Sequence, residues 1–431
     1  MFAAGVSAWR NRPAEVLKAL GGDADQIDVL AKVTERWLKR IGFDGSMPAP
    51  RAGDLPKVTI PERPPLWATS DEITLPIEVN AGNQALGEVA VRINGVPVVQ
   101  MKGDAWAAPA GGTAKGSVRL VLAEGQNWIE VNATDALGRR GETQRFRTIL
   151  KRGAQTHQRF VICLGVSEYA KPELNLEFAA KDAKDMMKAL QATDGGGTTR
   201  TLLLTDKQAD KGALEHIQSF AAQTSESDEI ILFCAGHGVL DENLDYVFAS
   251  HDFDPARAGL TGLKLDALLE AVSAGKARKR LVLLDTCQAG LVGEKDEVLL
   301  AQMDVKLPES VRAIKVPKPA TPPSTGLSAQ DQQRFIEEMF LLPGLKRGVS
   351  VIGASGGAQY ALESDLWRNG VFTASVIEAL RDRKADWNRD GQITVSELKS
   401  YVSQRVPELT GNAQRPSVVA FERDQDFVLK K

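Results

Sequence analysis

The sequence predicts an α/β fold: a mostly parallel sheet covered by helices on both faces, preceded by a small helical segment and an immunoglobulin-like β-sandwich. Three observations lead to this prediction. Residues 158–431 alternate continuous apolar runs with helical patterns, which is typical of parallel strands joined by crossover helices. Residues 57–152 consist of short alternating runs separated by turn residues, and residues 1–56 combine a helical pattern with a proline-rich linker.

Composition limits the class of protein. The chain has 431 residues, 43% hydrophobic and 25% charged, enough for two or three domains of a globular protein. A net charge of -3 gives no reason to expect nucleic acid or an anionic membrane as partner. Three cysteines do not suggest a disulfide framework, and the N-terminus lacks a signal-peptide pattern. We therefore expect a cytoplasmic protein with reduced thiols, and a monomer.

The N-terminal third carries no chemistry that the sequence reveals. Residues 13–42 have apolar positions near a period of 3.6, which predicts a helix ending at Gly42, and prolines crowd residues 43–66. In the following region, VAVRI and VPVVQM flank Asn94-Gly95, a strong hairpin signal because both turn positions need positive φ. The predicted sandwich contains no His or Cys, so we assign it packing or the binding of an activator or inhibitor protein.

The C-terminal region gives the clearest secondary-structure pattern. Buried strands are expected at 159–166, 200–205, 228–236, 279–287 and 349–355, and helices at 178–190, about 210–222 and 263–274. Active residues of such sheets gather beyond the carboxyl ends of the strands.

Two polar residues follow these strand ends. The run IILFCAG leads into His237-Gly238, and RLVLLD leads into Thr286-Cys287. A neighbouring imidazole can take the proton of a thiol whose pKa is near ~8.5 and so activate it as a nucleophile. The backbone N–H groups of Gly238 and Cys287 are candidates for an oxyanion hole. Either side chain alone would more often be structural, but the two together at strand ends favour catalysis.

These motifs resemble the caspase-like family, and more closely its metacaspase and bacterial orthocaspase branches. The similarity covers about 158–425 through GVSEY with the downstream AAKDA, then AGHG, DTCQAG, ASGGAQYALES and NGVFT. It implies a caspase-like fold and a cysteine endopeptidase with His237 as base and Cys287 as nucleophile. The chain keeps a His about 50 residues before the Cys but has Asp285-Thr286-Cys287 in place of Gln-Ala-Cys, which weakens any case for cleavage after aspartate.

The resemblance also implies a specificity. In metacaspases, an Asp two residues before the nucleophile and an Asp on the first helix hold a basic P1 side chain. The matching residues here are Asp285 and Asp182, and two carboxylates would pair with Arg or Lys and repel Asp or Glu. The alternative for Asp182 is that it caps its helix or faces solvent.

Residues 292–345 break the alternating pattern with a long segment that includes the proline-rich KVPKPATPPSTG. Caspase-like enzymes carry a processing linker at this point. Lys306, Arg312 and Lys315 are therefore candidates for self-cleavage, although a disordered insertion would explain the segment equally well.

A second motif lies at 386–397. It fits the twelve-residue EF-hand loop, with oxygen ligands at Asp386, Asn388, Asp390, the backbone carbonyl of Gln392, and Glu397. Gly391 stands at the sharp turn, and helical patterns flank the loop. We predict that this loop binds Ca²⁺, although such loops can also act only as capped turns.

We therefore expect an endopeptidase that cuts protein substrates after Arg or Lys, self-processed and Ca²⁺-responsive. The alternative is a catalytically silent caspase-fold interaction module regulated by Ca²⁺. A cysteine hydrolase acting on small amides is a third interpretation.

Overall fold

The structure, a computed structural model, divides into two compact units between residues 155 and 156. In the first unit, helix α2 (Pro13–Ala19) lies within the helix expected at 13–42. A turn at Gly21, whose φ is 71°, interrupts that expected helix, and positions 27, 31, 34 and 35 are again helical. The described residues are 13–19, 53–102, 106–151, 157–193, 198–241, 245–286, 311–313, 347–354, 362–364, 368–418 and 425–431, with single positions at 21, 27, 31, 34, 35, 243 and 344.

The first unit also contains two sheets that face each other across one core. One sheet has the strand order β1-β3-β6 and the other β2-β8-β7-β4-β5. Asn94 and Gly95 have φ of 52° and 74°, so the expected turn joins β4 to β5. This β-rich architecture agrees with the predicted sandwich, while its immunoglobulin-like topology stays a prediction. The strands are β1 (Lys57–Thr59), β2 (Trp67–Ala68), β3 (Glu72–Asn80), β4 (Leu86–Ile93), β5 (Val96–Met101), β6 (Thr113–Val121), β7 (Gly125–Asp135) and β8 (Gln144–Leu150).

The second unit is built on a six-stranded sheet with the order β10-β9-β11-β15-β17-β21. Its strands pair in parallel except for β21, which is antiparallel to β17. The strands are β9 (Gln158–Gly165), β10 (Thr198–Thr205), β11 (Glu229–Gly236), β15 (Lys279–Thr286), β17 (Ser350–Gly353) and β21 (Ser417–Val418). All eight residues of β11 are buried, as expected for a strand covered on both faces.

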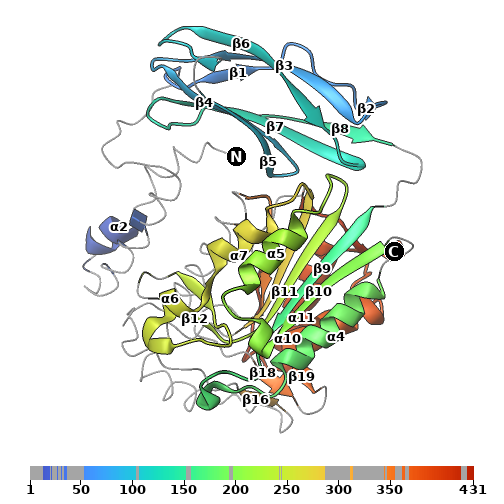
Figure 1. The fold of residues 1–431 in the computed structure, drawn as a ribbon. Helices are drawn as coiled ribbons and strands as arrows, with labels where there is room; N and C mark the ends of the chain where they lie inside the picture. The colour runs from blue at the N-terminus through green and yellow to red at the C-terminus, as the bar shows by residue number, and fades with distance from the viewer. Residues whose placement is uncertain are drawn as a thin grey trace. The chain divides into compact units, whose positions relative to one another are not determined.

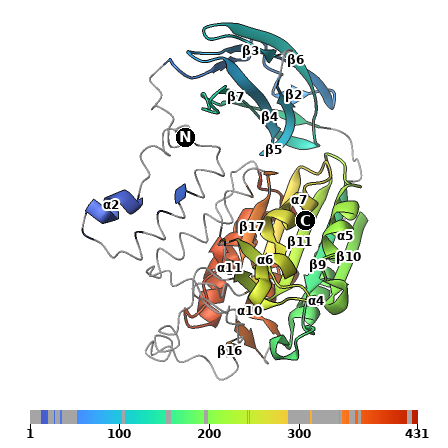
Figure 2. The ribbon, with the colours of Figure 1, turned by 60° about the vertical axis from the view of Figure 1, so that its left-hand side comes forward.

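Helices cover both faces of this sheet (Figures 1 and 2). One face packs against α4, α10 and α11 through a core that includes Met186, Phe372 and Leu398. The other face carries α5 and α7, which pack against each other. The helices are α4 (Ala179–Gln191), α5 (Ala213–Ala221), α7 (Leu265–Val272), α10 (Val371–Arg381) and α11 (Val395–Leu409). The predicted mostly parallel sheet with helices on both faces is confirmed.

Short elements complete this unit. Three small sheets have the orders β12-β13-β14, β16-β18-β19 and β20-β22. They consist of β12 (Gly238–Leu240), β13 (Tyr246–Phe248), β14 (Leu263–Lys264), β16 (Val311–Ala313), β18 (Leu362–Ser364), β19 (Asn369–Gly370), β20 (Ile393–Thr394) and β22 (Val428–Lys430). The single helical turns are η2 (Pro172–Leu174), η3 (Asp206–Gln208) and η4 (Pro255–Arg257), followed by α6 (Ala258–Thr261).

Strand β16 lies within the segment 292–345, for which the sequence indicated no strand. Its partner β18 supplies the backbone hydrogen bonds that a local sequence pattern does not show. The rest of the predicted linker lies outside the described residues, apart from Gly344. Among the helices that the structure describes, none combines the length and the apolar character needed to cross a bilayer.

Candidate active site

The sheet register brings the two predicted catalytic positions to one rim. Strands β11 and β15 are parallel neighbours, and their last register pair is Gly236 with Thr286. His237 is the next residue after Gly236, and Cys287 is the next residue after Thr286. Cys287 itself lies outside the described residues. Parallel neighbours run about 4.8 Å apart, so the two strands end side by side.

His237 is fully buried, and its contacts define which ring nitrogen is protonated. Nε2 lies 2.9 Å from the carbonyl oxygen of Leu174, at the end of η2. Because a carbonyl only accepts hydrogen bonds, Nε2 carries the proton and Nδ1 carries the lone pair. Nδ1 has no hydrogen-bond partner among the described residues. Burial lowers the pKa of His237 from 6.5 to about 4, so the imidazole is neutral at pH 7.

Tyr169 and the β12–β13 hairpin hold the histidine in place. The backbone N–H of His237 donates to the hydroxyl of Tyr169 at 3.1 Å, and the two rings lie 5.3 Å apart. The Ala249 N–H donates to the His237 carbonyl at 2.9 Å. In an antiparallel ladder, hydrogen-bonded pairs alternate with pairs that are not bonded. Since His237 is hydrogen-bonded to Ala249, the next pair, Gly238 with Phe248, is a pair that is not bonded. The Gly238 N–H therefore points away from β13.

The predicted P1 residues, Asp182 and Asp285, lie on either side of one glycine. A Cβ on Gly370 would lie 2.5 Å from Asp285 Oδ2 and 3.2 Å from Asp182 Oδ2. Both carboxylates are buried, with 3% of Asp182 and 7% of Asp285 exposed. We refer to Asp182 and Asp285 as the carboxylate pair. A Cβ at residue 370 would overlap with Asp285 Oδ2, so glycine is the residue that fits beside both carboxylates.

The N-terminus of α10 binds the carboxylate pair. Thr373 donates both its N–H (3.1 Å) and its hydroxyl to Asp285 Oδ2, and the Gly370 N–H donates to Asp182 Oδ2 at 3.1 Å. These are the N–H groups that the first turn of a helix leaves without intrahelical partners. Among the described residues, Asp285 has no cationic partner, and both of its hydrogen bonds use Oδ2. Burial raises the pKa of Asp285 from 3.8 to about 6.

Asn369 connects Asp182 to a further carboxylate, that of Asp185. Its Nδ2 donates to Asp182 Oδ1 at 2.6 Å and to Asp185 Oδ2 at 3.3 Å. Lys181 Nζ donates to Asp185 Oδ2 at 2.6 Å and to Asn369 Oδ1 at 3.2 Å. The Asn369 side chain of β19 therefore contacts the first turns of α4 and orients Asp182.

A segment of the predicted linker pairs with a strand beside the carboxylate pair. In β16, Arg312 lies opposite Glu363 of β18. In turn, Glu363 lies opposite Gly370 of β19. The chain around Arg312 is thus extended and antiparallel to β18, two strands from Gly370. Lys306 and Lys315 lie outside the described residues.

Side-chain oxygens of the loop 386–397 accept backbone N–H groups of the same loop. Asp386 Oδ1 and Oδ2 accept the N–H groups of Asp390 and Gly391, each at 3.1 Å, and Gly391 has a φ of 82°. Asp390 Oδ1 accepts the Gln392 N–H at 2.8 Å. These hydrogen bonds close the loop. No group of three or more His, Cys, Asp or Glu side chains within the described ranges is arranged to hold a metal.

In Glu397, the last residue of this loop, one carboxylate oxygen is hydrogen-bonded within the described part of the chain and the other is not. Its Oε2 accepts the Thr394 N–H at 2.9 Å in a capping box at the start of α11. Its Oε1 has no hydrogen-bond partner among the described residues, although only 4% of Glu397 is exposed. A buried carboxylate oxygen without a partner is costly, and a cation at the loop would satisfy it.

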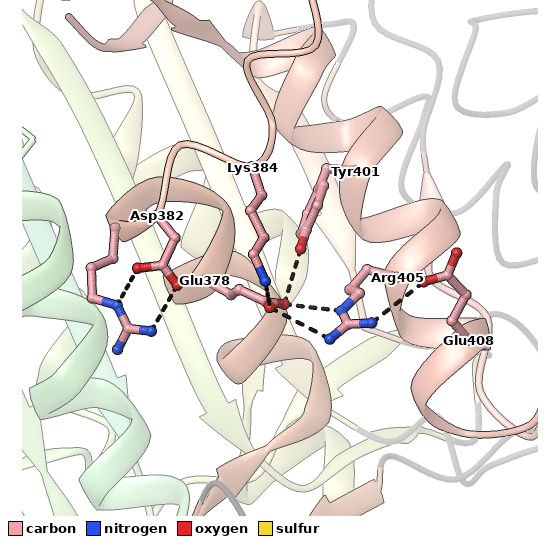
Figure 3. Close-up of polar contacts among 7 residues, drawn as sticks. Glu378, Asp382, Lys384, Tyr401, Arg405 and Glu408 are labelled. Atoms are coloured by element: carbon pink, nitrogen blue, oxygen red, sulfur yellow. Dashed lines mark hydrogen bonds and ion pairs between the residues drawn. The ribbon is translucent and has the colours of Figure 1, made fainter.

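The two helices that flank the loop are joined by a cluster around Glu378 (Figure 3). The Glu378 carboxylate accepts the Tyr401 hydroxyl and Arg405 Nε, both at 2.9 Å, and also Lys384 Nζ. Because Glu378 lies on α10 and Tyr401 on α11, the cluster joins the two helices on either side of the loop.

The sequence did not identify several residues of this site. Tyr169, Asn369, Gly370 and Thr373 lie in the motifs GVSEY and NGVFT, but spacing alone gave them no role. The Leu174 carbonyl has no side-chain signal at all. Cys163 and Cys234 lie in the core as free cysteines, and burial raises the pKa of both thiols, as expected of inert residues.

Comparisons with known proteins identify the family. A family model described as the caspase domain matches residues 158–428. Similar solved structures include a Geobacter sulfurreducens protein, with 16% identity over 64% of this chain and 94% of that chain and a TM-score of 0.40. Caspase-1 from Spodoptera frugiperda has 12% identity over 64% of this chain and 91% of its own, with a TM-score of 0.37.

Fibronectin(III)-like modules of Clostridium thermocellum CbhA match 22% of this chain and 100% of their own length, at 12% identity and a TM-score of 0.17. No curated protein matches the sequence.

The chain belongs to the caspase family, because the match spans well over half of its length. The resemblance to the caspase-like family is confirmed, while the metacaspase and orthocaspase branches stay a prediction. Members of this family are cysteine peptidases, which makes proteolysis the class of activity to expect of this protein.

Proposed function

We propose that this protein is a cysteine endopeptidase with Cys287 as nucleophile and His237 as general base. The observation that carries the proposal is the state of His237. It is buried and neutral, its Nε2–H is held by Leu174, and its Nδ1 has no partner within the described chain. A neutral imidazole with one fixed tautomer is what a general base requires.

In the proposed reaction, Nδ1 accepts the thiol proton as the sulfur attacks the scissile carbonyl carbon. The oxygen gains the carbonyl electron pair and is held by the N–H groups of Gly238 and Cys287. The C–N bond then breaks, and the leaving amine takes the proton from Nδ1. Water hydrolyses the resulting thioester, giving one proton to Nδ1, which returns it to the sulfur.

We infer that the substrate residue before the cleaved bond is Arg or Lys. Asp285 is buried two residues before the nucleophile, and no cation neutralises it among the described residues. Since burial raises its pKa only to about 6, the carboxylate is mostly charged at pH 7.5. A guanidinium or ammonium group bound beside the carboxylate pair would compensate this buried charge.

An extended polypeptide fits this site better than a small amide. Strand β18 already pairs with β16, a segment from another part of the chain. Pairing of a substrate backbone with a strand edge is a common mode of peptide recognition. The pairing of β16 with β18 also puts part of the linker near the carboxylate pair. This position supports self-cleavage after Lys306, Arg312 or Lys315.

Peptides that differ only at the P1 residue test the activity. We expect turnover of P1-Arg and P1-Lys peptides, none of P1-Asp, and loss of all turnover in Cys287→Ala. An arginine chloromethylketone should label the wild type and not this variant. A wild type that neither turns over nor is labelled would instead support the silent interaction module, and faster cleavage after Asp would refute the basic specificity.

Self-cleavage is tested with the same variant. Purified wild type should be cut within 306–316, and purified Cys287→Ala should stay intact under the same conditions. Equal nicking of both proteins would show that another protease cuts the linker.

We also propose that the loop 386–397 binds Ca²⁺ through oxygens of Asp386, Asn388, Asp390, Gln392 and Glu397. The buried, unpartnered Oε1 of Glu397 favours this second function, because its carboxylate already lies against the loop through Thr394. Movement of Glu397 toward Asp386 and Asp390 would complete the oxygen ligands.

Terbium luminescence tests the calcium proposal without an activity assay. Trp387 lies at the second loop position and is 74% exposed, so it can sensitise a bound Tb³⁺ ion. We expect sensitised emission that Ca²⁺ displaces, and an affinity at least about 10-fold lower in Glu397→Gln, which removes the charge of one ligand. Trp387→Phe should lose emission but keep Ca²⁺ binding by calorimetry. Absence of calorimetric binding in the wild type would refute the site.

Regulation by Ca²⁺ is a separate proposal, supported by the position of α10. This helix begins at the carboxylate pair and ends shortly before the loop. Peptide turnover with and without Ca²⁺ tests it, and identical rates would contradict it.

A further inference from the structure

The hairpin formed by β12 and β13 connects the histidine strand to the cysteine strand. It begins directly after His237, and its second strand begins with Tyr246. The Tyr246 hydroxyl is hydrogen-bonded to Thr286 Oγ1, next to Cys287 in the chain. The chain from His237 to Tyr246 and the hydrogen bond from Tyr246 to Thr286 therefore connect the two catalytic positions.

The hydrogen bond between Tyr246 and Thr286 lies at the end of the backbone ladder between β11 and β15. The parallel ladder between β11 and β15 ends at Gly236 and Thr286, so no further rung of this ladder fixes the residues beyond. Tyr246 and Thr286 are buried, with 3% and 2% of their surfaces exposed. A hydrogen bond shielded from water at this point resists separation of the two strand ends.

Asp241 and Lys264 contribute polar contacts to the described part of this hairpin. Asp241, the residue that follows β12, is 2% exposed and accepts the N–H groups of Asn243 and Asp245 at 2.9 and 2.7 Å. Lys264 Nζ lies 3.0 Å from Asp241 Oδ2, and β13 also pairs with β14. Tyr246 thus extends from β13, which pairs with both β12 and β14.

We propose that Tyr246 is a positioning residue, which sets the distance between the nucleophile and its base by holding Thr286. This inference rests on the proposed roles of Cys287 and His237. Displacements of about 1 Å in a reacting pair can cost roughly 100-fold in rate, so one well-placed bond matters. In this scheme Tyr246 acts through Thr286.

The test compares Tyr246→Phe, Thr286→Val and the double variant on a P1-Arg peptide. We expect each single variant to lower kcat about 5- to 10-fold with KM within about 2-fold, since one buried hydrogen bond is lost. The double variant should be no slower than either single one, because both remove the same bond. Thr286→Ser keeps the hydroxyl and should retain most of the activity. Thr148→Val, which removes a buried hydroxyl bonded to the Pro65 carbonyl in the β-sandwich, is the matched control and should leave kcat unchanged.

A second measurement separates this inference from the proposed function. The rate of Cys287 alkylation by iodoacetamide, followed by mass spectrometry, depends on the thiol and its base but not on peptide cleavage. We expect Tyr246→Phe to alkylate about 5- to 10-fold more slowly than wild type at pH 7 and at an equal rate above pH 10, where the thiolate forms unaided. Equal alkylation at pH 7, or additive losses in the double variant, would overturn the role of Tyr246. A wild type inactive on every peptide would refute the peptidase and leave the alkylation comparison to decide this inference.

Discussion

Asp285→Asn should make the protein more stable at alkaline pH while lowering its activity. Burial raises the pKa of Asp285 from 3.8 to about 6, so the folded state binds its proton more tightly than the unfolded chain. The stability contribution of this group is therefore fully present below pH 3.8 and is lost as the pH rises through about 6. A shift of about two units corresponds to about 3 kcal/mol at pH 8.

Asparagine avoids this cost because it carries no charge. Its side-chain oxygen can still accept the two bonds that Thr373 now donates to Asp285. We expect Asp285→Asn to raise the free energy of unfolding by up to about 3 kcal/mol at pH 8 and by about half as much at pH 5. For P1-Arg peptides, loss of one member of a buried charge pair should cost about 2–5 kcal/mol, a fall in kcat/KM of roughly 30-fold to several thousand-fold.

Urea denaturation at pH 5 and pH 8 and peptide kinetics measure the two effects separately. Asp254→Asn is a control of opposite sign, because hydrogen bonds from Lys171 and Arg257 lower the pKa of Asp254 to about 2. This control should lose stability at pH 8 rather than gain it. An Asp285→Asn protein that is less stable than wild type at pH 8, or that keeps full P1-Arg activity, would refute the assignment of a buried, uncompensated charge.

Other substitutions test neighbouring parts of the site. Gly370→Ala would place a Cβ 2.5 Å from Asp285 Oδ2, so we expect a loss of about 1–3 kcal/mol in urea denaturation and no measurable P1-Arg turnover; normal kinetics would show that turnover does not depend on the position of this carboxylate. The pKa of His237 is lowered to about 4 by burial, so this residue stabilises the fold above pH 6.5, and about 3 kcal/mol should be lost as the pH falls toward 4. His237→Gln should show a shallower acid transition, and an unchanged one would contradict the burial of a neutral imidazole. Glu378→Gln weakens the cluster between α10 and α11 and should lower the unfolding free energy by about 1–2 kcal/mol; an unchanged midpoint would show that the cluster adds no stability.

Much of the fold follows from local sequence pattern. The run IILFCAG could be assigned to a buried strand because apolar residues fill every position, and β11 is buried throughout. Asn94-Gly95 predicted a hairpin because positive φ at both positions strongly favours these residues, and the structure has that turn. Patterns of this kind are informative since each depends on residues within a few positions of one another.

The polar arrangement of the site required the tertiary structure. Thr373 lies 88 residues from the carboxylate that it binds, and Gly370 lies 188 residues from Asp182. The sequence identified both aspartates only through resemblance, and it could not show that the N-terminus of α10 supplies their hydrogen bonds. Contacts at such separations depend on how strands and helices pack, which no local pattern encodes.

By itself, the sequence determined which chemical groups this protein has available: an imidazole and a thiol after two apolar strands, two acidic residues, and a loop rich in oxygen ligands. Only the tertiary structure decided the state of those groups. The Leu174 carbonyl selects the tautomer of His237, and burial with helix N–H donors sets the charge of Asp285. Protonation depends on solvent access and on partners in space, and both arise only when the chain has folded.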